Sequence, residues 1–202
     1  MKTLKIYCVG VGGQGNVLAA KLVGEAALIA GVPVLLSETH GMAQRGGVVE
    51  STVVLGGAAS PTIADACADI LLAFEPLEAV RALNKVHRQS LIVSSTSAVK
   101  PFSPSGDGSA YPPVESLVEY LRSHCGRVLA FDGRKIALEQ GNPLGLNMVM
   151  LGALYATGEM PMPADAQREA IARGTKAAFL DKNLACFDAG LAAGLPSPGA
   201  AL

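Results

Sequence analysis

A glycine-rich turn near the N-terminus constrains the fold more than any other feature of the chain. The run Gly10-Val11-Gly12-Gly13-Gln14-Gly15 fits the pattern G-x-G-x-x-G. An apolar run at residues 4–9 precedes it, and a stretch with helical spacing follows at residues 16–30. A strand before the glycines and a helix after them are the context that this motif requires. The sequence therefore predicts a strand–turn–helix unit whose helix N-terminus could face an anion.

Apolar runs and helical repeats alternate along the rest of the chain. We expect further strands at residues 32–37, 48–55, 68–74, 91–94 and 127–131, and further helices at residues 63–67, 76–83, 114–123, 144–156, 165–173 and 176–189. This alternation predicts an α/β fold with a mainly parallel sheet covered on both faces. Only helices are expected after Pro143, and Gly152 and Ala153 would let one of them approach a neighbour closely. The tail at residues 194–202 is expected to be flexible.

Charged residues are scarce, at 16% of the 202 residues, against about 25% in typical soluble domains. A net charge of −1 argues against a nucleic-acid-binding protein, which should carry a basic excess. The scarcity has two interpretations: a well-covered core with an alanine-rich surface, or a surface partly buried by another chain. Composition alone favours the first.

The chain shows no export signal and no membrane span. Its longest uncharged stretch, residues 140–158, contains asparagine, proline and several glycines, and so predicts a buried helix. The four cysteines, Cys8, Cys67, Cys125 and Cys186, are too scattered to show metal-ligand or iron–sulfur spacing. We therefore expect a cytoplasmic protein with buried, reduced thiols and no redox centre of its own.

A second glycine-rich stretch, residues 39–47, follows the strand expected at 32–37. Ligands of open α/β sheets bind at the carboxyl ends of the strands, so this stretch should lie beside the first turn. Arg45 offers a planar donor fork for a carboxylate or phosphate, His40 could exchange protons near neutral pH, and Gln44 supplies a neutral donor and acceptor. Each also has a structural interpretation, such as pairing of Arg45 with a nearby glutamate or packing of Met42 at an interface.

Glu38 lies 23 residues after Gly15, close to where a dinucleotide-binding fold places the carboxylate that binds the ribose. On the motif alone, two interpretations are about equally supported. One is an NAD- or FAD-dependent enzyme, and the other is a tight turn that only packs the helix on the sheet.

Four segments together resemble the gamma-type domain of 2-oxoacid:ferredoxin oxidoreductases, and specifically its indolepyruvate branch. They are the turn at 10–15, the run at 37–47, the segment at 68–79 and residues 147–152. The run His40-Gly41-Met42-Ala43-Gln44-Arg45-Gly46-Gly47 is the most specific of them. The resemblance covers nearly the whole chain and implies a Rossmann-like three-layer fold, with residues 1–193 forming one domain.

The resemblance also implies a subunit of a larger enzyme. That enzyme decarboxylates an aryl pyruvate on thiamine diphosphate, forms a coenzyme A thioester and passes electrons through iron–sulfur clusters to ferredoxin. Thiamine diphosphate, Mg²⁺ and the clusters are expected in a large alpha subunit, and none of them in this chain alone. The role implied for this chain is to complete the active-site cleft and help receive the anionic substrate or coenzyme A.

The residues expected to face substrate or cofactor, or to lie at the subunit interface, gather in the two glycine-rich segments. They are Gly10, Gly12, Gly13, Gln14, Gly15, Glu38, His40, Gly41, Met42, Gln44, Arg45, Gly46 and Gly47. None is assigned a catalytic or metal-binding role. The alternatives are a free-standing NAD(P)-dependent oxidoreductase and a nucleotide-binding adaptor module.

Overall fold

The structure, a computed structural model, describes residues 2–40, 47–99 and 111–195. One six-stranded sheet forms its centre, with the spatial order β2-β3-β1-β4-β5-β6. The strands are β1 (Leu4–Val11), β2 (Val34–His40), β3 (Val48–Leu55), β4 (Ala68–Ala73), β5 (Val86–Ser95) and β6 (Arg127–Phe131). The helices are α1 (Asn16–Ile29), α2 (Pro76–Arg81), the 3₁₀ turn η1 (Leu83–Lys85), α3 (Val114–His124), α4 (Gly133–Glu139), α5 (Leu146–Ala156), α6 (Ala164–Gly174) and α7 (Ala177–Gly194).

The sheet is mainly parallel, as expected. β1 pairs in parallel with β4, β4 with β5, and β5 with β6. β3 is antiparallel to both of its neighbours, β1 and β2. β3 alone is reversed, so the carboxyl ends of the other five strands meet at one edge, which we call the carboxyl edge.

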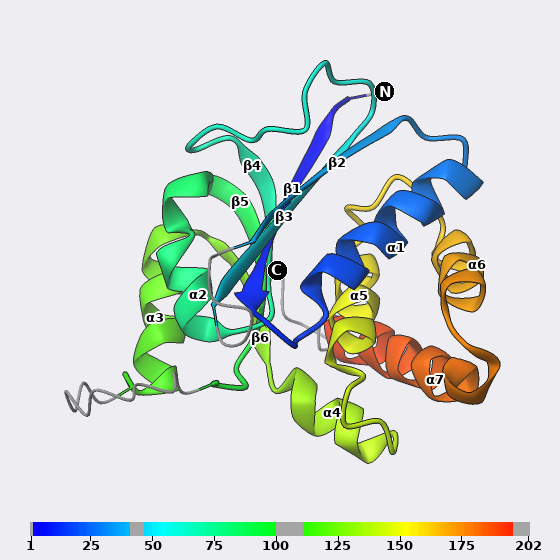
Figure 1. The fold of residues 1–202 in the computed structure, drawn as a ribbon. Coiled ribbons are helices and arrows are strands. Elements are labelled where there is room, and N and C mark those ends of the chain that lie inside the picture. Colours follow the sequence, from blue (N-terminus) through cyan, green and yellow to red (C-terminus); the bar gives the residue numbers. More distant parts are fainter. Residues whose placement is uncertain (1, 41–46, 100–110, 196–202) are drawn as a thin grey trace.

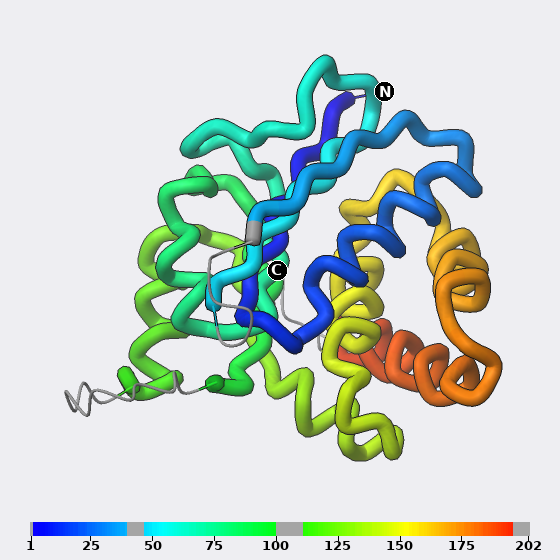
Figure 2. Tube along the Cα trace, viewed as in Figure 1, coloured from blue at the N-terminus to red at the C-terminus, as the bar shows by residue number. Residues whose placement is uncertain are grey.

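Helices cover both faces of the sheet (Figure 1). α2 and α3 lie on one face, and α1, α5, α6 and α7 lie on the other. Figure 2 shows α1, from the start of the chain, running beside the helices of its last third. A hydrophobic cluster fills the space on each side of the sheet, which confirms the three-layer α/β architecture.

The helical C-terminal segment is built on close backbone contact. Residues 146–155 of α5 are all buried, as expected for a helix that is apolar on every side. A Cβ placed on Gly152 would lie 2.0 Å from the Phe187 carbonyl oxygen of α7. Gly152 therefore allows the close approach that the sequence predicts.

Two local expectations are wrong. Residues 63–67 form no helix, because the backbone N–H groups of Ala66 and Cys67 donate to the carbonyls of Asn84 and Lys85, at 2.8 and 3.0 Å. α4 was not expected, although Asp132 caps it by accepting from the Lys135 N–H at 2.9 Å. Within the described ranges, no helix has both the length and the apolar run needed to cross a bilayer.

Candidate functional site

The first glycine-rich turn connects the end of β1 to the start of α1 at the carboxyl edge. A Cβ on Gly10 would lie 2.8 Å from Gln14 Oε1 and 3.0 Å from the Phe74 Cβ, so this position has no room for a side chain. Gly13 and Gly15 have φ angles of +99° and +78°, a region that glycine enters without steric cost. The fold itself thus requires these glycines, and the motif is not in itself proof of a nucleotide site.

The Gln14 side chain holds the turn against the sheet through two hydrogen bonds. Its Oε1 accepts from the Val11 N–H at 2.8 Å, and its Nε2 donates to the Phe74 carbonyl at 2.8 Å. The side-chain amide thus joins the carboxyl ends of β1 and β4. Both of its polar atoms are engaged within the protein, so Gln14 shapes the site.

Two asparagines that the sequence analysis did not single out fix the start of α1. Asn16 is buried, and its Nδ2 donates to the Val49 carbonyl of β3 at 2.6 Å. Asn147, at the start of α5, is buried beside Gly15, and a Cβ on Gly15 would lie 2.7 Å from its Nδ2. The sequence signal for Asn147 was its polarity within an otherwise apolar stretch.

The second glycine-rich stretch reaches the first turn at its last residue. The Gly12 N–H donates to the Gly47 carbonyl at 3.0 Å. Gly41, Met42, Gln44, Arg45 and Gly46 lie outside the described residues, as does the side chain of His40. Their assignment to the site therefore stays a prediction.

Glu38 does not have the position that a ribose-binding carboxylate has in a dinucleotide-binding fold. There the strand that carries the carboxylate lies directly beside the first strand. Here β3 separates β2 from β1, so Glu38 is two strand spacings of about 4.8 Å from β1. Its carboxylate pairs instead with Lys21 of α1, with Nζ and Oε1 3.4 Å apart.

Two hollows adjoin the turn, and Gly12 and Gly13 line both. The first, which we call the Arg134 hollow, has a volume of about 250 Å³ and is lined by Val11, Gly12, Gly13, Gln14, Ser97, Val99, Arg134, Pro143, Leu144 and Leu146. The second, the Lys21 hollow, has a volume of about 480 Å³ and is lined by Gly12, Gly13, Gly15, Asn16, Val17, Leu18, Lys21 and Val49. Among the described residues, the only charged side chain that lines each hollow is a cation.

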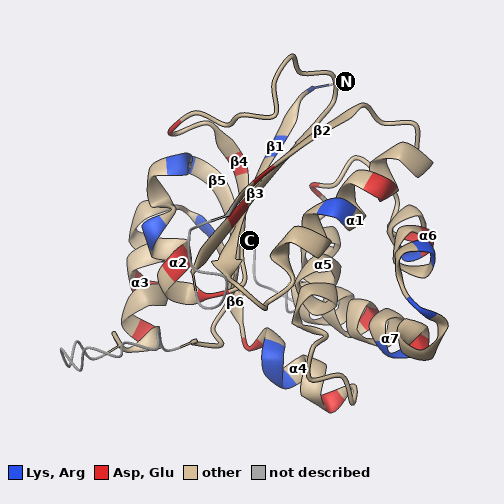
Figure 3. Ribbon diagram, in the orientation of Figure 1, with Lys and Arg blue, Asp and Glu red and all other residues tan. Residues whose placement is uncertain are grey.

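The surroundings of these hollows are poor in charge. Residues 6–20 and 140–158 contain no Lys, Arg, Asp or Glu, and Figure 3 shows the start of α1 and the whole of α5 without charged residues. Leu144 is nevertheless 84% exposed. The carboxyl edge thus combines backbone N–H groups, two cations and exposed apolar surface.

Comparison with known proteins assigns the family. Residues 5–193 match the model of the pyruvate ferredoxin/flavodoxin oxidoreductase family. The chain belongs to this family. The match spans both sides of the sheet and includes every element that forms the carboxyl edge.

Curated relatives within the family are similar over nearly their whole length. The chain is 40% identical over 192 residues to a protein of Methanothermobacter thermautotrophicus named indolepyruvate oxidoreductase subunit IorB, covering 95% of this chain and 98% of that protein. It is 37% identical to a protein of the same name from Pyrococcus horikoshii, covering 96% of each. The gamma subunit of a keto/oxoacid ferredoxin oxidoreductase from Geobacter sulfurreducens has the same fold, with a TM-score of 0.72, 23% identity and coverage of 96% of this chain and 97% of that chain.

The iron–sulfur clusters expected for the family do not fit the residues that the structure describes. An iron–sulfur cluster needs several cysteine ligands that converge on it. Cys8 is buried in β1, Cys125 just after α3 and Cys186 in α7; Cys67 is partly buried, and all four are free. Within the part of the chain that the structure describes, no three His, Cys, Asp or Glu residues gather in a way that could hold a metal ion.

An acidic pair is buried at the carboxyl end of β4, near the turn. Glu75 caps α2, and its Oε2 accepts from the Glu78 N–H at 2.9 Å. Glu78 Oε1 pairs with Arg81 Nη1 at 2.6 Å, while its Oε2 is buried with no hydrogen-bond partner among the described residues. Burial therefore raises the pKa of the Glu78 carboxyl above its ordinary value of 4.5.

Glu78 should make stability depend on pH in a direction that is uncommon for a carboxyl group. Because its pKa is higher in the folded chain, its stabilising effect is complete below pH 4.5 and is lost as the pH rises through the raised pKa. We expect Glu78→Gln to gain stability relative to the wild type between pH 4.5 and pH 7, as measured by urea unfolding at both. Glu169→Gln, at an exposed position on α6, is the control and should show no such gain. A constant difference between Glu78→Gln and the wild type would contradict the burial of this carboxyl.

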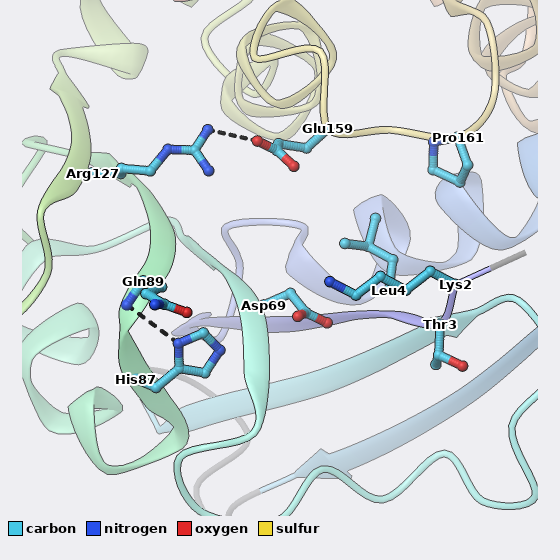
Figure 4. Close-up of a pocket in the computed structure, with 9 residues that line it drawn as sticks. All are labelled: Lys2, Thr3, Leu4, Asp69, His87, Gln89, Arg127, Glu159 and Pro161. Atoms are coloured by element: carbon cyan, nitrogen blue, oxygen red, sulfur yellow. Dashed lines mark hydrogen bonds and ion pairs between the residues drawn. The ribbon is translucent and has the colours of Figure 1, made fainter. Parts of the chain in front are cut away.

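A third hollow, of about 330 Å³, lies at the opposite edge of the sheet (Figure 4). Lys2 lines it too, but three of its charged groups, Arg127, Glu159 and Asp69, are engaged within the protein. Arg127 Nη2 pairs with Glu159 Oε1 at 2.5 Å, and Asp69 Oδ2 accepts from the Lys5 N–H at 2.8 Å. Ligands of α/β sheets bind outside the carboxyl ends of the strands. We therefore take the carboxyl edge as the candidate functional site.

Proposed function

We propose that the chain is the beta subunit of an indolepyruvate:ferredoxin oxidoreductase. The observation that carries this proposal is the 40% identity, over 95% of this chain, to a protein named indolepyruvate oxidoreductase subunit IorB. The complete enzyme would convert an aryl pyruvate and coenzyme A into an aryl-acetyl thioester, CO₂, one proton and two electrons, and ferredoxin would accept the electrons.

The partner in this proposal is a large alpha subunit that holds thiamine diphosphate, Mg²⁺ and the iron–sulfur clusters. Thiamine diphosphate would supply the decarboxylation chemistry. The dispersed, mostly buried cysteines of this chain support placing the clusters in the partner. The beta subunit would then be inactive alone and would complete the active-site cleft with its carboxyl edge.

The carboxyl edge has the chemistry that this role needs. The Arg134 hollow offers a guanidinium, and both hollows offer the backbone of Gly12 and Gly13, to anions such as 2-oxo acids and coenzyme A. The charge-poor surroundings and exposed Leu144 suit contact with another protein, because the cores of interfaces are depleted in charge.

The alternatives receive less support. A free-standing NAD(P)-dependent oxidoreductase would need its ribose-binding carboxylate beside β1, where β3 lies instead. An adaptor would bind a nucleotide through the same turn, but Gly10, Gly13 and Gly15 of that turn are already required by packing or by backbone angles. We further propose that residues 1–193 act as one domain around the single sheet, and that the free cysteines fit a reducing cytoplasm.

Reconstitution tests the proposed function. The chain is co-expressed with a candidate alpha subunit from its host, and reduction of a viologen dye is measured with indolepyruvate and coenzyme A. We expect dye reduction from the purified complex, none from either subunit alone, and no reduction of NAD⁺ by this chain. Tight NAD⁺ binding with 2-oxoacid-dependent turnover by the isolated chain would overturn the proposal, and so would a complex that oxidises no aryl pyruvate.

A further inference from the structure

The Arg134 hollow has a lining of two parts that face one opening at the carboxyl edge. One part is polar and includes Arg134, Ser97, Gln14 and the glycines Gly12 and Gly13. The other part is apolar and includes Pro143, Leu144 and Leu146. A ligand that matches this lining carries one negative group and a compact apolar body.

We propose that the Arg134 hollow binds the aryl-2-oxo acid substrate, with Arg134 pairing with its carboxylate and the apolar wall contacting its aromatic ring. This inference rests on the proposed function and adds to it a substrate-binding residue that belongs to this chain rather than to the partner subunit.

The backbone around Arg134 is fixed in place. The Ser97 hydroxyl accepts from the Arg134 N–H at 3.2 Å and donates to Asp132 Oδ1 at 2.7 Å, which ties the first turn of α4 to the segment after β5. A Cβ on Gly133 would lie 2.8 Å from the Leu146 Cδ1, so α4 presses directly against the start of α5. The backbone that carries Arg134 is therefore held beside the apolar wall.

The guanidinium of Arg134 is available for a ligand. None of the carboxylates in the described ranges pairs with it. Asp132, two residues earlier, is already engaged by the Ser97 hydroxyl and by the Lys135 N–H at 2.9 Å. A guanidinium suits a carboxylate because its planar fork can donate two parallel hydrogen bonds.

The size and charge of the hollow favour an aryl-2-oxo acid over coenzyme A. Its volume of about 250 Å³ lies just below the range of roughly 300–1,000 Å³ that accommodates drug-sized ligands. Coenzyme A carries several phosphate charges, and one arginine is the only cation among the described residues that line this hollow. An aryl pyruvate carries a single carboxylate next to an apolar ring.

The expected kinetic effect is on KM. The carboxylate leaves as CO₂, so a pairing with Arg134 stabilises the bound substrate and does not strengthen in the transition state. Loss of such binding raises KM and leaves kcat nearly unchanged. A hydrogen bond to a charged group corresponds to about a 10-fold to 100-fold change in binding.

The test uses the reconstituted complex with the alpha subunit. Arg134→Ala should raise KM for phenylpyruvate by about 10-fold to 100-fold, with kcat within about twofold and KM for coenzyme A unchanged. Lys135→Ala removes the same charge from the same turn of α4 at a residue that does not line the hollow, and it should leave every constant unchanged. Arg134→Lys should be intermediate, because lysine keeps the charge but not the planar fork.

The outcomes separate this inference from the proposed function. Dye reduction by the wild-type complex together with an unchanged KM for phenylpyruvate in Arg134→Ala overturns the inference alone. A rise in KM for coenzyme A instead of phenylpyruvate assigns the hollow to the co-substrate and also overturns it. If the Arg134→Ala chain fails to assemble with the alpha subunit, the KM of Arg134→Lys for phenylpyruvate tests the inference in its place. Failure of both variants to co-purify with the alpha subunit overturns the inference, because Arg134 is then an interface residue.

Discussion

Replacing Gly190 with alanine should lower the free energy of unfolding by roughly 3 kcal/mol, the upper end of what overpacking costs in protein cores. Gly190 lies in α7, where a Cβ would come within 2.0 Å of the Val149 carbonyl oxygen and 2.8 Å of the Val149 carbonyl carbon in α5. A backbone atom cannot rotate away as a side chain can, so the two helices would have to move apart. The higher helix propensity of alanine offsets only about 1 kcal/mol of this cost.

Gly126→Ala is the matched control, because a Cβ on Gly126 would meet nothing within 4 Å. Urea denaturation of both variants measures the difference, and Gly126→Ala should remain within about 0.5 kcal/mol of the wild type. If Gly190→Ala unfolded at the same urea concentration as Gly126→Ala, α5 and α7 could not be in backbone contact as the structure has them.

The small residues of the C-terminal helices show what the sequence reveals about packing. The sequence predicts that Gly152 allows a close neighbour, because a glycine within an apolar helix lowers its propensity and needs a packing reason. It does not identify that neighbour as α7, since helix pairing depends on how the whole chain folds. Gly190 and Gly194 are one helical turn apart, and a Cβ on Gly194 would also approach α5, at 2.8 Å from the Ala153 Cα.

The sequence predicts a mainly parallel sheet but not the direction of every strand. The buried strands are apolar enough to be located from the sequence, whereas the reversed direction of β3 was not foreseen. The sequence signal for this reversal is the length of the connection between β2 and β3. Residues 41–47, between β2 and β3, are too few for the crossover of a dozen or more residues that a parallel pair needs. This reversal is what separates Glu38 from β1.

The sequence predicts the part of the candidate site that a local motif determines. It does not predict the part that depends on how distant segments pack together. The glycines of the first turn follow from a local motif, and the contact from Gly12 to Gly47 brings the end of the second stretch beside it. The sequence does not point to Arg134, which we propose as a binding residue, because α4 has only seven residues and is too short for a periodic signal. Its capping residue, Asp132, directly after the last strand, was the available clue.

Replacing Glu75 with alanine should cost about 3 kcal/mol, because it leaves one buried and two partly buried donors without their acceptor, and a buried unpaired donor alone costs about 1–3 kcal/mol. Glu75 is 1% exposed. Its carboxylate accepts from the Glu78 N–H at 2.9 Å, from the Val99 N–H at 3.2 Å and from the Tyr111 hydroxyl. One carboxylate therefore joins Val99 and Tyr111 to the start of α2.

Thermal and urea unfolding of Glu75→Ala, Tyr111→Phe and the double variant measure this arrangement as a double-mutant cycle. Tyr111→Phe removes only the hydroxyl and should cost about 1 kcal/mol, and the two changes together should cost less than their sum because they remove one shared contact. Glu119→Ala, at an exposed position on α3, is the control for loss of a negative charge and should be nearly neutral. If the losses of stability in Glu75→Ala and Tyr111→Phe were strictly additive, the Tyr111 hydroxyl would not donate to Glu75. If Glu75→Ala were as stable as Glu119→Ala, the Glu75 carboxylate would accept from none of its three donors.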